Sequence, residues 1–270
     1  MTDISPPTTM SSLRDRTDFD EPAVFLPENM LREARRQRGL ADGPIPEFCI
    51  LDPDGDIVRH LLREKRAERS TSWACYHTQL WETDAANIRI GIVGGAVGAS
   101  FAVLVAEELF ASGCTFLMSI TSAGKVAPDV PDSCVMLIDQ ALRGEGTSDA
   151  YLPPAPMVVA DQALVDEVSQ HLDQTGLPVL RGTSWTTDAP FRETATALAT
   201  AKSAGAQIVE MEAAALYAFA AAGGHAVICF AHVTNAMAVA DGDFDKGPAD
   251  GAGQALAVIS AIAQGCGASY

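Results

Sequence analysis

The sequence predicts a single α/β domain with a central mixed β-sheet flanked by helices. Short apolar segments of strand character alternate with longer segments of helical character along the chain. Two of the strand-like segments run into glycine turns that open a helix, at Gly55 and at Gly94. With 270 residues, 48% hydrophobic and 20% charged, the chain can bury a substantial core. We expect residues 1–44 to be an extension, partly disordered with one short helix, and residues 45–270 to be the domain itself.

Charge and composition exclude several classes of protein. The net charge of −17, from 35 acidic and 18 basic residues, argues against nucleic acid or an anionic membrane surface as a partner. No apolar stretch reaches the ~20 residues of a membrane span, and the polar N-terminal segment lacks a signal-peptide core. The six cysteines are scattered without a Cys-x-x-Cys pair, so we expect free thiols, no metal site and a cytoplasmic protein.

A first candidate anion site follows the first predicted strand. Residues 27–40 predict an amphipathic helix that ends at Gly39, and residues 46–51 predict the strand. The strand runs into Asp-Gly-Asp and a helix, a backbone arrangement that presents free N–H groups to an anion. Arg59 lies one helical turn beyond Gly55, so its side chain can reach back over the turn. The same residues could instead form only a turn and a helix cap.

Three more strands are predicted at residues 73–80, 87–93 and 115–120. The second runs into the glycine turn at Gly94 and a helix over residues 101–113. The third ends in a turn where Thr121 and Ser122 offer hydroxyls and backbone amides to an anion. No Gly-Lys-Ser/Thr follows Gly94, and no acidic residue stands where a dinucleotide-binding fold holds a ribose. The segment therefore matches neither a P-loop nor a dinucleotide fingerprint.

The second half of the chain continues the alternation. It predicts strands at 133–139, from 179 onward and at 226–233, with helices at 161–175 and 249–263. The almost wholly apolar strand 226–233 ends in Thr234-Asn235. This is the carboxyl end, where α/β sheets place their chemistry.

An alanine-rich run at residues 209–220 predicts a buried helix with two carboxylates at its opening. Glu210 could be a helix N-terminal acid near the positive end of the macrodipole. Glu212 lies two residues deeper, and a buried carboxylate needs a partner because burying it unpaired is costly. One carboxylate can accept both hydroxyls of a vicinal diol, and the Met211 thioether can lie against the carbon face of a sugar.

Together these segments resemble the purine/uridine (nucleoside) phosphorylase superfamily over about residues 45–265, with several motifs in the family's order. The resemblance rests on Gly55-Asp56-x-x-Arg59, the Gly94-Gly95 turn with Glu107-Glu108-Leu109, the loop from Arg143 to Pro153, Thr187-Asp188 with Phe191, and Glu210-Met211-Glu212.

The resemblance implies cleavage of the N-glycosidic bond of a purine or pyrimidine nucleoside, to free base and ribose 1-phosphate. Inorganic phosphate would be the co-substrate, with no other cofactor. It also implies a homo-oligomer, a dimer or a trimer of dimers, whose active site is completed by a neighbouring subunit. The implied contacts are Glu210, Met211 and Glu212 to ribose; Gly55, Arg59, Gly94, Thr121 and Ser122 to phosphate; and Phe191, Arg192 and Asn235 to the base, with Glu212, Asn235 and Arg59 as catalytic residues.

The chain departs from the family pattern around the anion and the base. The phosphorylases carry an arginine about three residues before the threonine of the third strand, where this chain has Met118. An arginine commonly lent by the neighbouring subunit has no clear match either. Guanidinium groups supply much of the grip on phosphate. At the base, the aspartate of purine-specific relatives is replaced by Asn235, which cannot be a general acid but can hydrogen-bond a 6-oxopurine.

Three alternatives to phosphorolysis therefore stay open. The Ser-Ala-Gly segment at residues 122–124 is similar to that of the hydrolytic nucleosidases of the same superfamily, which use water. A catalytically weakened nucleoside-binding protein is the second alternative, and a dinucleotide-binding oxidoreductase is the third.

Overall fold

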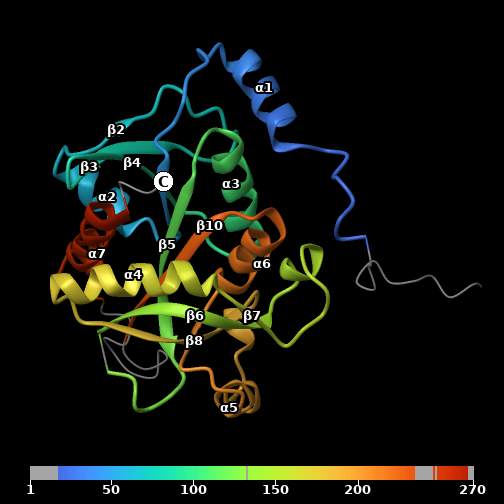
Figure 1. The fold of residues 1–270 in the computed structure, drawn as a ribbon, viewed down its shortest axis with the longest axis vertical. Coiled ribbons are helices and arrows are strands. Elements are labelled where there is room, and N and C mark those ends of the chain that lie inside the picture. The colour runs from blue at the N-terminus through green and yellow to red at the C-terminus, as the bar shows by residue number, and fades with distance from the viewer. Residues whose placement is uncertain (1–17, 132, 235–245, 247, 267–270) are drawn as a thin grey trace, which may run out of the picture.

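The computed structural model describes residues 18–131, 133–234, 246 and 248–266. They form one α/β domain with a mixed sheet, which confirms the predicted fold class (Figure 1). The helices are α1 (Pro27–Arg38), α2 (Asp56–Arg63), α3 (Ala99–Ala111), α4 (Gln162–Thr175), α5 (Ala195–Ser203), α6 (Ala213–Gly223) and α7 (Ala252–Cys266). The strands are β1 (Phe48–Asp52), β2 (Glu68–Arg69), β3 (Leu80–Ala85), β4 (Ile88–Gly94), β5 (Phe116–Lys125), β6 (Val135–Gly144), β7 (Met157–Val159), β8 (Val179–Thr187), β9 (Ile208–Glu210) and β10 (Ala226–Val233).

The sheet is built around parallel strands that end at a common edge. Strand β1 pairs in parallel with β4 and β5, and β5 pairs in parallel with β10. The pairings β10–β6, β6–β8, β8–β9 and β9–β5 then lead back to β5, so these strands close a ring. The carboxyl ends of β1, β4, β5 and β10 are therefore neighbours, and α/β sheets commonly place their binding sites at this edge.

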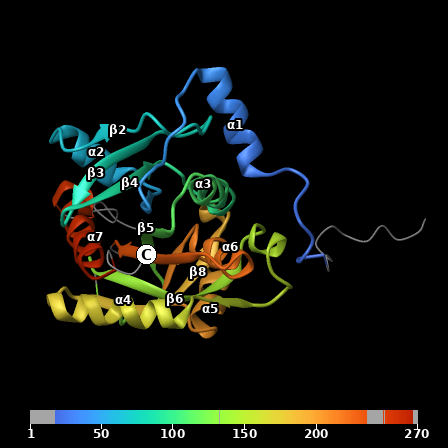
Figure 2. The ribbon, with the colours of Figure 1, turned by 45° about the horizontal axis from the view of Figure 1, so that its top comes forward.

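Helices cover the sheet on two sides. In both views α2 and α7 lie together on one side, and α3 and α6 lie together on the other (Figures 1 and 2). Helix α1 packs on α3 and projects from the body of the domain. It ends at Gly39, as the sequence predicts, in the left-handed conformation that favours glycine (φ 62°). The domain boundary near residue 45 stays a prediction.

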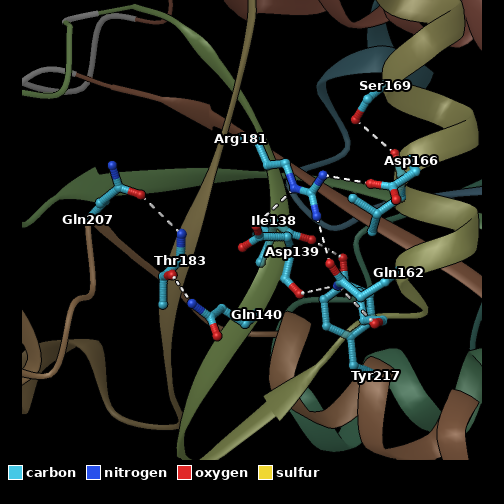
Figure 3. A network of polar contacts seen from close by, with 12 residues as sticks. Ile138, Asp139, Gln140, Gln162, Asp166, Ser169, Arg181, Thr183, Gln207 and Tyr217 are labelled. Atoms are coloured by element: carbon cyan, nitrogen blue, oxygen red, sulfur yellow. Dashed lines mark hydrogen bonds and ion pairs between the residues drawn. The ribbon is translucent and has the colours of Figure 1, made fainter.

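Helix α4 is fixed on the sheet by an arginine of β8 (Figure 3). Arg181 donates from Nε to Asp139 of β6 at 2.9 Å. Its two terminal nitrogens donate to Asp166 and Gln162 of α4, at 2.8 and 2.6 Å. One guanidinium therefore joins two strands and a helix through three hydrogen bonds, two of them to carboxylates.

Helix α6 is fixed by a buried tyrosine. The Tyr217 hydroxyl donates to the Ile138 carbonyl of β6 at 2.5 Å (Figure 3). The same oxygen accepts from the Cys229 N–H of β10 at 2.9 Å. Both backbone groups are buried, so the tyrosine satisfies two groups that would otherwise be left without partners. The position of α6, and of the residues at its N-terminus, depends on this contact.

Several predicted boundaries are wrong. Residues 73–79 form a loop and not a strand: they pair with no described strand, and Trp73 bonds within the segment, from Nε1 to Thr78 at 3.0 Å. Strand β3 begins only at Leu80 and pairs with β4 as a hairpin. The segment 121–124 is not a turn: β5 continues to Lys125, because β10 pairs with it as far as Ala123 and β9 pairs with its last two residues.

The third wrong boundary is the start of α6. The helix begins at Ala213, so Glu210 is the last residue of β9 and Glu212 is the residue before the helix, not two residues inside it. The final helix begins at Ala252 and not at residue 249, because Ala249 and Asp250 have left-handed backbones (φ 55° and 54°). The strand at 226–233 and the helix after Gly55 are confirmed. None of the described helices is long and apolar enough to cross a bilayer.

Candidate active site

The turns after β1 and β4 meet at the carboxyl edge of the sheet. The Asp52 carbonyl accepts from the N–H groups of Gly55 and Gly95, at 2.9 and 3.0 Å. A Cβ on Gly94 would stand 3.3 Å from the Gly55 Cα, so the two turns are in direct contact. Gly55 has a φ of 74°, a conformation that disfavours any side chain. The structure therefore brings Gly55 and Gly94 together, as the sequence predicts.

Arg59 folds back over the Gly55 turn. Its Nη1 would lie 2.9 Å from a Cβ on Gly55, which is the reach that the spacing predicts. Its guanidinium forms an ion pair with Asp56, and its side chain is 60% exposed. Inside the turn, the Asp52 carboxylate accepts from the Val58 N–H at 3.0 Å, and burial raises its pKa to about 7.

Both carboxylate oxygens of Glu210 are occupied by the chain. One carboxylate oxygen accepts from the Thr186 hydroxyl at 2.5 Å, and the other accepts from the N–H groups of Glu212 and Ala213, both at 2.7 Å. The Thr186 oxygen also accepts from the Ala214 N–H at 2.9 Å. Glu210 therefore caps the N-terminus of α6, which is the structural alternative that its sequence position allows.

Glu212 has one oxygen bound and one left over. Oε1 accepts from the Gly98 N–H at 2.7 Å, while Oε2 accepts no hydrogen bond from the residues that the structure describes. The side chain is buried, with 1% of the residue exposed. Burial and the charge of Glu210 raise its pKa to about 8, and the Gly98 N–H and the nearby Thr121 hydroxyl oppose that rise. An acidic group this buried, with one free oxygen, is poised to take a hydroxyl donor.

Met211 lies beside Glu212 and faces the same turn. Its methyl carbon would be 4.0 Å from a Cβ on Gly98, and Gly98 has a φ of 91°. The Met211 side chain therefore lies close to Gly98. The predicted ribose-binding pair, Met211 and Glu212, is brought together against this glycine turn.

The predicted anion donors on Ser122 are already engaged by a carboxylate. Asp54 accepts from the Ser122 N–H at 2.7 Å and from the Ser122 hydroxyl at 3.1 Å. Lys246 approaches the same carboxylate at 3.2 Å and Asp56 at 2.5 Å. The charge of Asp54 also raises the pKa of Glu212.

A small cavity of about 20 Å³ lies next to this cluster, and a space of that size holds about one water molecule. His232 faces it and donates to or accepts from Gln254 through Nε2 at 3.0 Å. Burial is the main cause that lowers the pKa of His232, and the positive charge of Lys246 lowers it further. The cavity walls include Asp52, Asp54, Asp56, Thr121, Ser122, His232, Lys246 and Asp250.

Met118 is a core residue of β5. It is fully buried and pairs between Ile50 of β1 and Ile228 of β10. Its thioether carries no charge, so the strand that leads to Thr121 contributes no cation at this position. The cations that the described residues place around the Gly55 turn are Arg59 and Lys246, both paired with Asp56.

The predicted base-binding residues are less closely grouped. Phe191 and Arg192 lie in the short 3-10 helix Pro190–Arg192 after β8, and Phe191 is 99% exposed. Asn235 lies outside the described residues. The nearby loop from Arg143 is tied to itself, because Arg143 donates to Ser148 at 2.8 Å and to Asp149 at 2.7 Å.

Sequence reasoning missed residues whose partners are distant in the chain. Asp54 is 68 residues from Ser122, and Gly98 is 114 residues from Glu212. The signal for Asp54 is present in the sequence, since it lies in the same Asp-Gly-Asp turn as Gly55. The residues next to Asp54 do not indicate that its side chain points toward Ser122. Thr186, His232 and Lys246 carry no spacing pattern that would have identified them.

Comparison with known proteins agrees with this architecture. A family model described as the phosphorylase superfamily matches residues 48–264. The structure is similar to uridine phosphorylase from Vibrio fischeri ES114, with a TM-score of 0.69 and 22% identity, covering 83% of this chain and 93% of that one. It is also similar to purine nucleoside phosphorylase from Toxoplasma gondii in complex with immucillin-H, with a TM-score of 0.69, 16% identity and coverage of 83% and 90%. No curated protein sequence matches the chain.

A fold and an edge site of this kind define a phosphorylase-like α/β protein. The family match extends over most of the chain, and the chain belongs to the phosphorylase superfamily. The two solved structures, at their low identity, show the shared fold.

Proposed function

We propose that this protein cleaves the N-glycosidic bond of a nucleoside and releases the free base. The observation that carries the proposal is Glu212, a buried acid with one oxygen fixed by Gly98 and the other unpartnered among the described residues. A ribose hydroxyl supplies the missing donor, and Met211 offers an apolar surface beside it. Glu210 caps α6 and accepts from the Glu212 N–H, so we propose that it positions Glu212 and does not bind ribose.

Bond cleavage leaves the electron pair of the C1′–N bond on the base and positive charge on the sugar. Glu212, in its ionised form, stabilises that positive charge beside the sugar, while donors at the base stabilise the departing negative charge. For the base we retain Phe191, Arg192 and Asn235 as the proposed contacts. Because Phe191 is almost wholly exposed in one chain, we propose that a second subunit of a homo-oligomer completes this end of the site.

Phosphate and water are the two candidate nucleophiles, and we favour water. A phosphate at the Gly55 turn would meet Asp54 and Asp56, and Met118 replaces the arginine that relatives carry. Like charges within a few ångströms repel strongly at a partly buried site. The cavity of about 20 Å³ suits one water molecule. Phosphorolysis with inorganic phosphate, which the family resemblance implies, is the second candidate, supported by the proximity of Gly55, Arg59 and Gly94.

The test is base release from inosine, guanosine, adenosine, uridine and thymidine, each with and without inorganic phosphate. We expect release without phosphate, with ribose and not ribose 1-phosphate as the sugar product. Strict dependence on phosphate would establish the second candidate. Nucleoside binding by calorimetry with no release of any base would contradict enzymatic cleavage and leave a nucleoside-binding protein.

Glu212→Ala is the matched test of the site itself. We expect loss of at least about a hundredfold in kcat/KM, because an interaction with the reacting sugar is removed. Thermal unfolding should show that the variant is folded. Wild-type turnover by the folded variant would refute the ribose assignment.

A further inference from the structure

We propose that Asp54 is a specificity-determining residue: its carboxylate acts as a built-in anion on the donors that would hold phosphate, and so directs the site to water. This inference rests on the proposed function, because it concerns the nucleophile of the same site. It goes further in assigning the choice of nucleophile to one side chain.

The first support is the pair of donors that Asp54 occupies. The Ser122 N–H and hydroxyl converge on its two oxygens, at 2.7 and 3.1 Å. Two convergent donors are the kind of grip that an oxyanion takes. Phosphate cannot use them while the carboxylate is in place, and the carboxylate comes from the chain, so its local concentration is always high.

The second support is the charge around the carboxylate. Lys246 contacts both Asp54 and Asp56, so its positive charge is already shared by two acids. Arg59 is paired with Asp56 as well. An entering phosphate dianion would therefore find the nearby cations neutralised, while a neutral water molecule meets no such barrier.

The third support is space. The cavity beside Asp54 and Ser122 has a volume of about 20 Å³, enough for about one water molecule. Removal of the Asp54 side chain would enlarge this cavity, free the two Ser122 donors and release half of the neutralisation of Lys246. All three changes favour an anion.

The experiment uses the full chain with Asp54→Ala and, as a smaller perturbation, Asp54→Ser. Each variant is titrated with inorganic phosphate by calorimetry and assayed for ribose 1-phosphate with the nucleoside panel. We expect phosphate to bind at least about tenfold more tightly than to the wild type, since the two Ser122 donors are freed and the repelling charge on them is removed. We also expect base release to become phosphate-stimulated, with ribose 1-phosphate among the products.

Two controls separate the donor effect from the loss of charge. Asp250→Asn removes a negative charge from the same cavity wall without freeing Ser122, and asparagine tolerates the left-handed backbone at this position (φ 54°). It should leave phosphate binding nearly unchanged. The double variant Asp54→Ala with Ser122→Ala keeps the charge change but lacks the hydroxyl, and should lose most of the gain.

The outcomes distinguish this inference from the proposed function. Folded Asp54 variants that bind phosphate no more tightly than the wild type would overturn it, even if hydrolysis is confirmed. An equal gain in Asp250→Asn would also overturn it, because general charge would then be sufficient. If no variant cleaves any nucleoside, the proposed function fails, while the calorimetric gain still decides the role of Asp54.

Discussion

Two glutamates separated by one residue have different roles at this site. Glu210 accepts three hydrogen bonds from the chain and is satisfied. Glu212 accepts one, from Gly98, and keeps a buried oxygen without a described partner. The difference follows from the backbone, because β9 directs Glu210 under the start of α6 while the next bend directs Glu212 toward the glycine turn.

A comparison of two variants tests this division. Glu210→Ala leaves two backbone N–H groups and the Thr186 hydroxyl without their acceptor, so we expect the free energy of unfolding to fall by about 3 kcal/mol. Glu212→Ala removes one hydrogen bond and an unfavourably buried acid, so its stability should change by less than about 1 kcal/mol. Urea unfolding at pH 7 measures both.

Glu210→Gln is the control, since its amide oxygen can still accept from the two N–H groups and should recover part of the stability. Equal losses of stability in the two alanine variants would show that the two acids do not differ in this way.

A site residue can be predicted from the sequence when it lies in a short motif, and not when its role depends on a distant partner. Glu212, Met211, Gly55 and Arg59 can be predicted as candidates because their motifs are short and place them on one turn or helix opening. The bond from Ser122 to Asp54 is not predicted, since it joins a strand to a turn 68 residues away and depends on the direction of the turn side chain.

At the scale of elements, periodicity identified most strands and helices but misplaced several boundaries. Strand β10 and helix α4 are set by apolar pattern and capping, and the Asp161 side chain accepts from the first turn of α4 as a cap should. The extension of β5 through residues 121–124 was missed because it depends on pairing with β9 and β10. Hydrogen bonds to distant strands outweigh local turn preference there.

Tyr217 provides a prediction at this scale, since one hydroxyl joins α6 to two strands. Tyr217→Phe leaves the Ile138 carbonyl and the Cys229 N–H buried without that partner. We expect the free energy of unfolding to fall by about 1–3 kcal/mol, the cost of unsatisfied buried groups. Denaturant unfolding measures it. Tyr76→Phe, at a side chain that is 43% exposed, is the control and should change little; an equal effect in both variants would refute the anchoring role.

At the scale of the whole molecule, acidity is the dominant feature. The chain carries a net charge of −17, and several of its carboxylates are clustered at the site. A negative molecule with a negative site attracts anions poorly, which is consistent with water as the nucleophile. The homo-oligomer that we propose would bury part of this surface, and its size can be measured by light scattering.

The buried acids also predict how stability depends on pH. Burial raises the pKa of Asp52 to about 7 and of Glu212 to about 8, while the same groups in the unfolded chain ionise near pH 4. Their contribution to stability is therefore fully present below about pH 4 and is lost as pH rises through the folded pKa values. The lowered pKa values of His225 and His232 act in the opposite direction, but only below their ordinary value of 6.5.

Between pH 6.5 and 8.5 the carboxyl groups should therefore dominate, and the free energy of unfolding should fall. Each pKa unit corresponds to about 1.4 kcal/mol, so Glu212 alone should contribute on the order of 2 kcal/mol over this range. Urea unfolding in high salt, which screens the general repulsion of the −17 charge, isolates the effect. Glu212→Gln carries no titrating group at this position, so the wild type should lose stability relative to this variant as pH rises. Parallel curves for the two proteins would mean that Glu212 is already ionised at pH 6.5, and that its free oxygen meets the ribose as a carboxylate throughout.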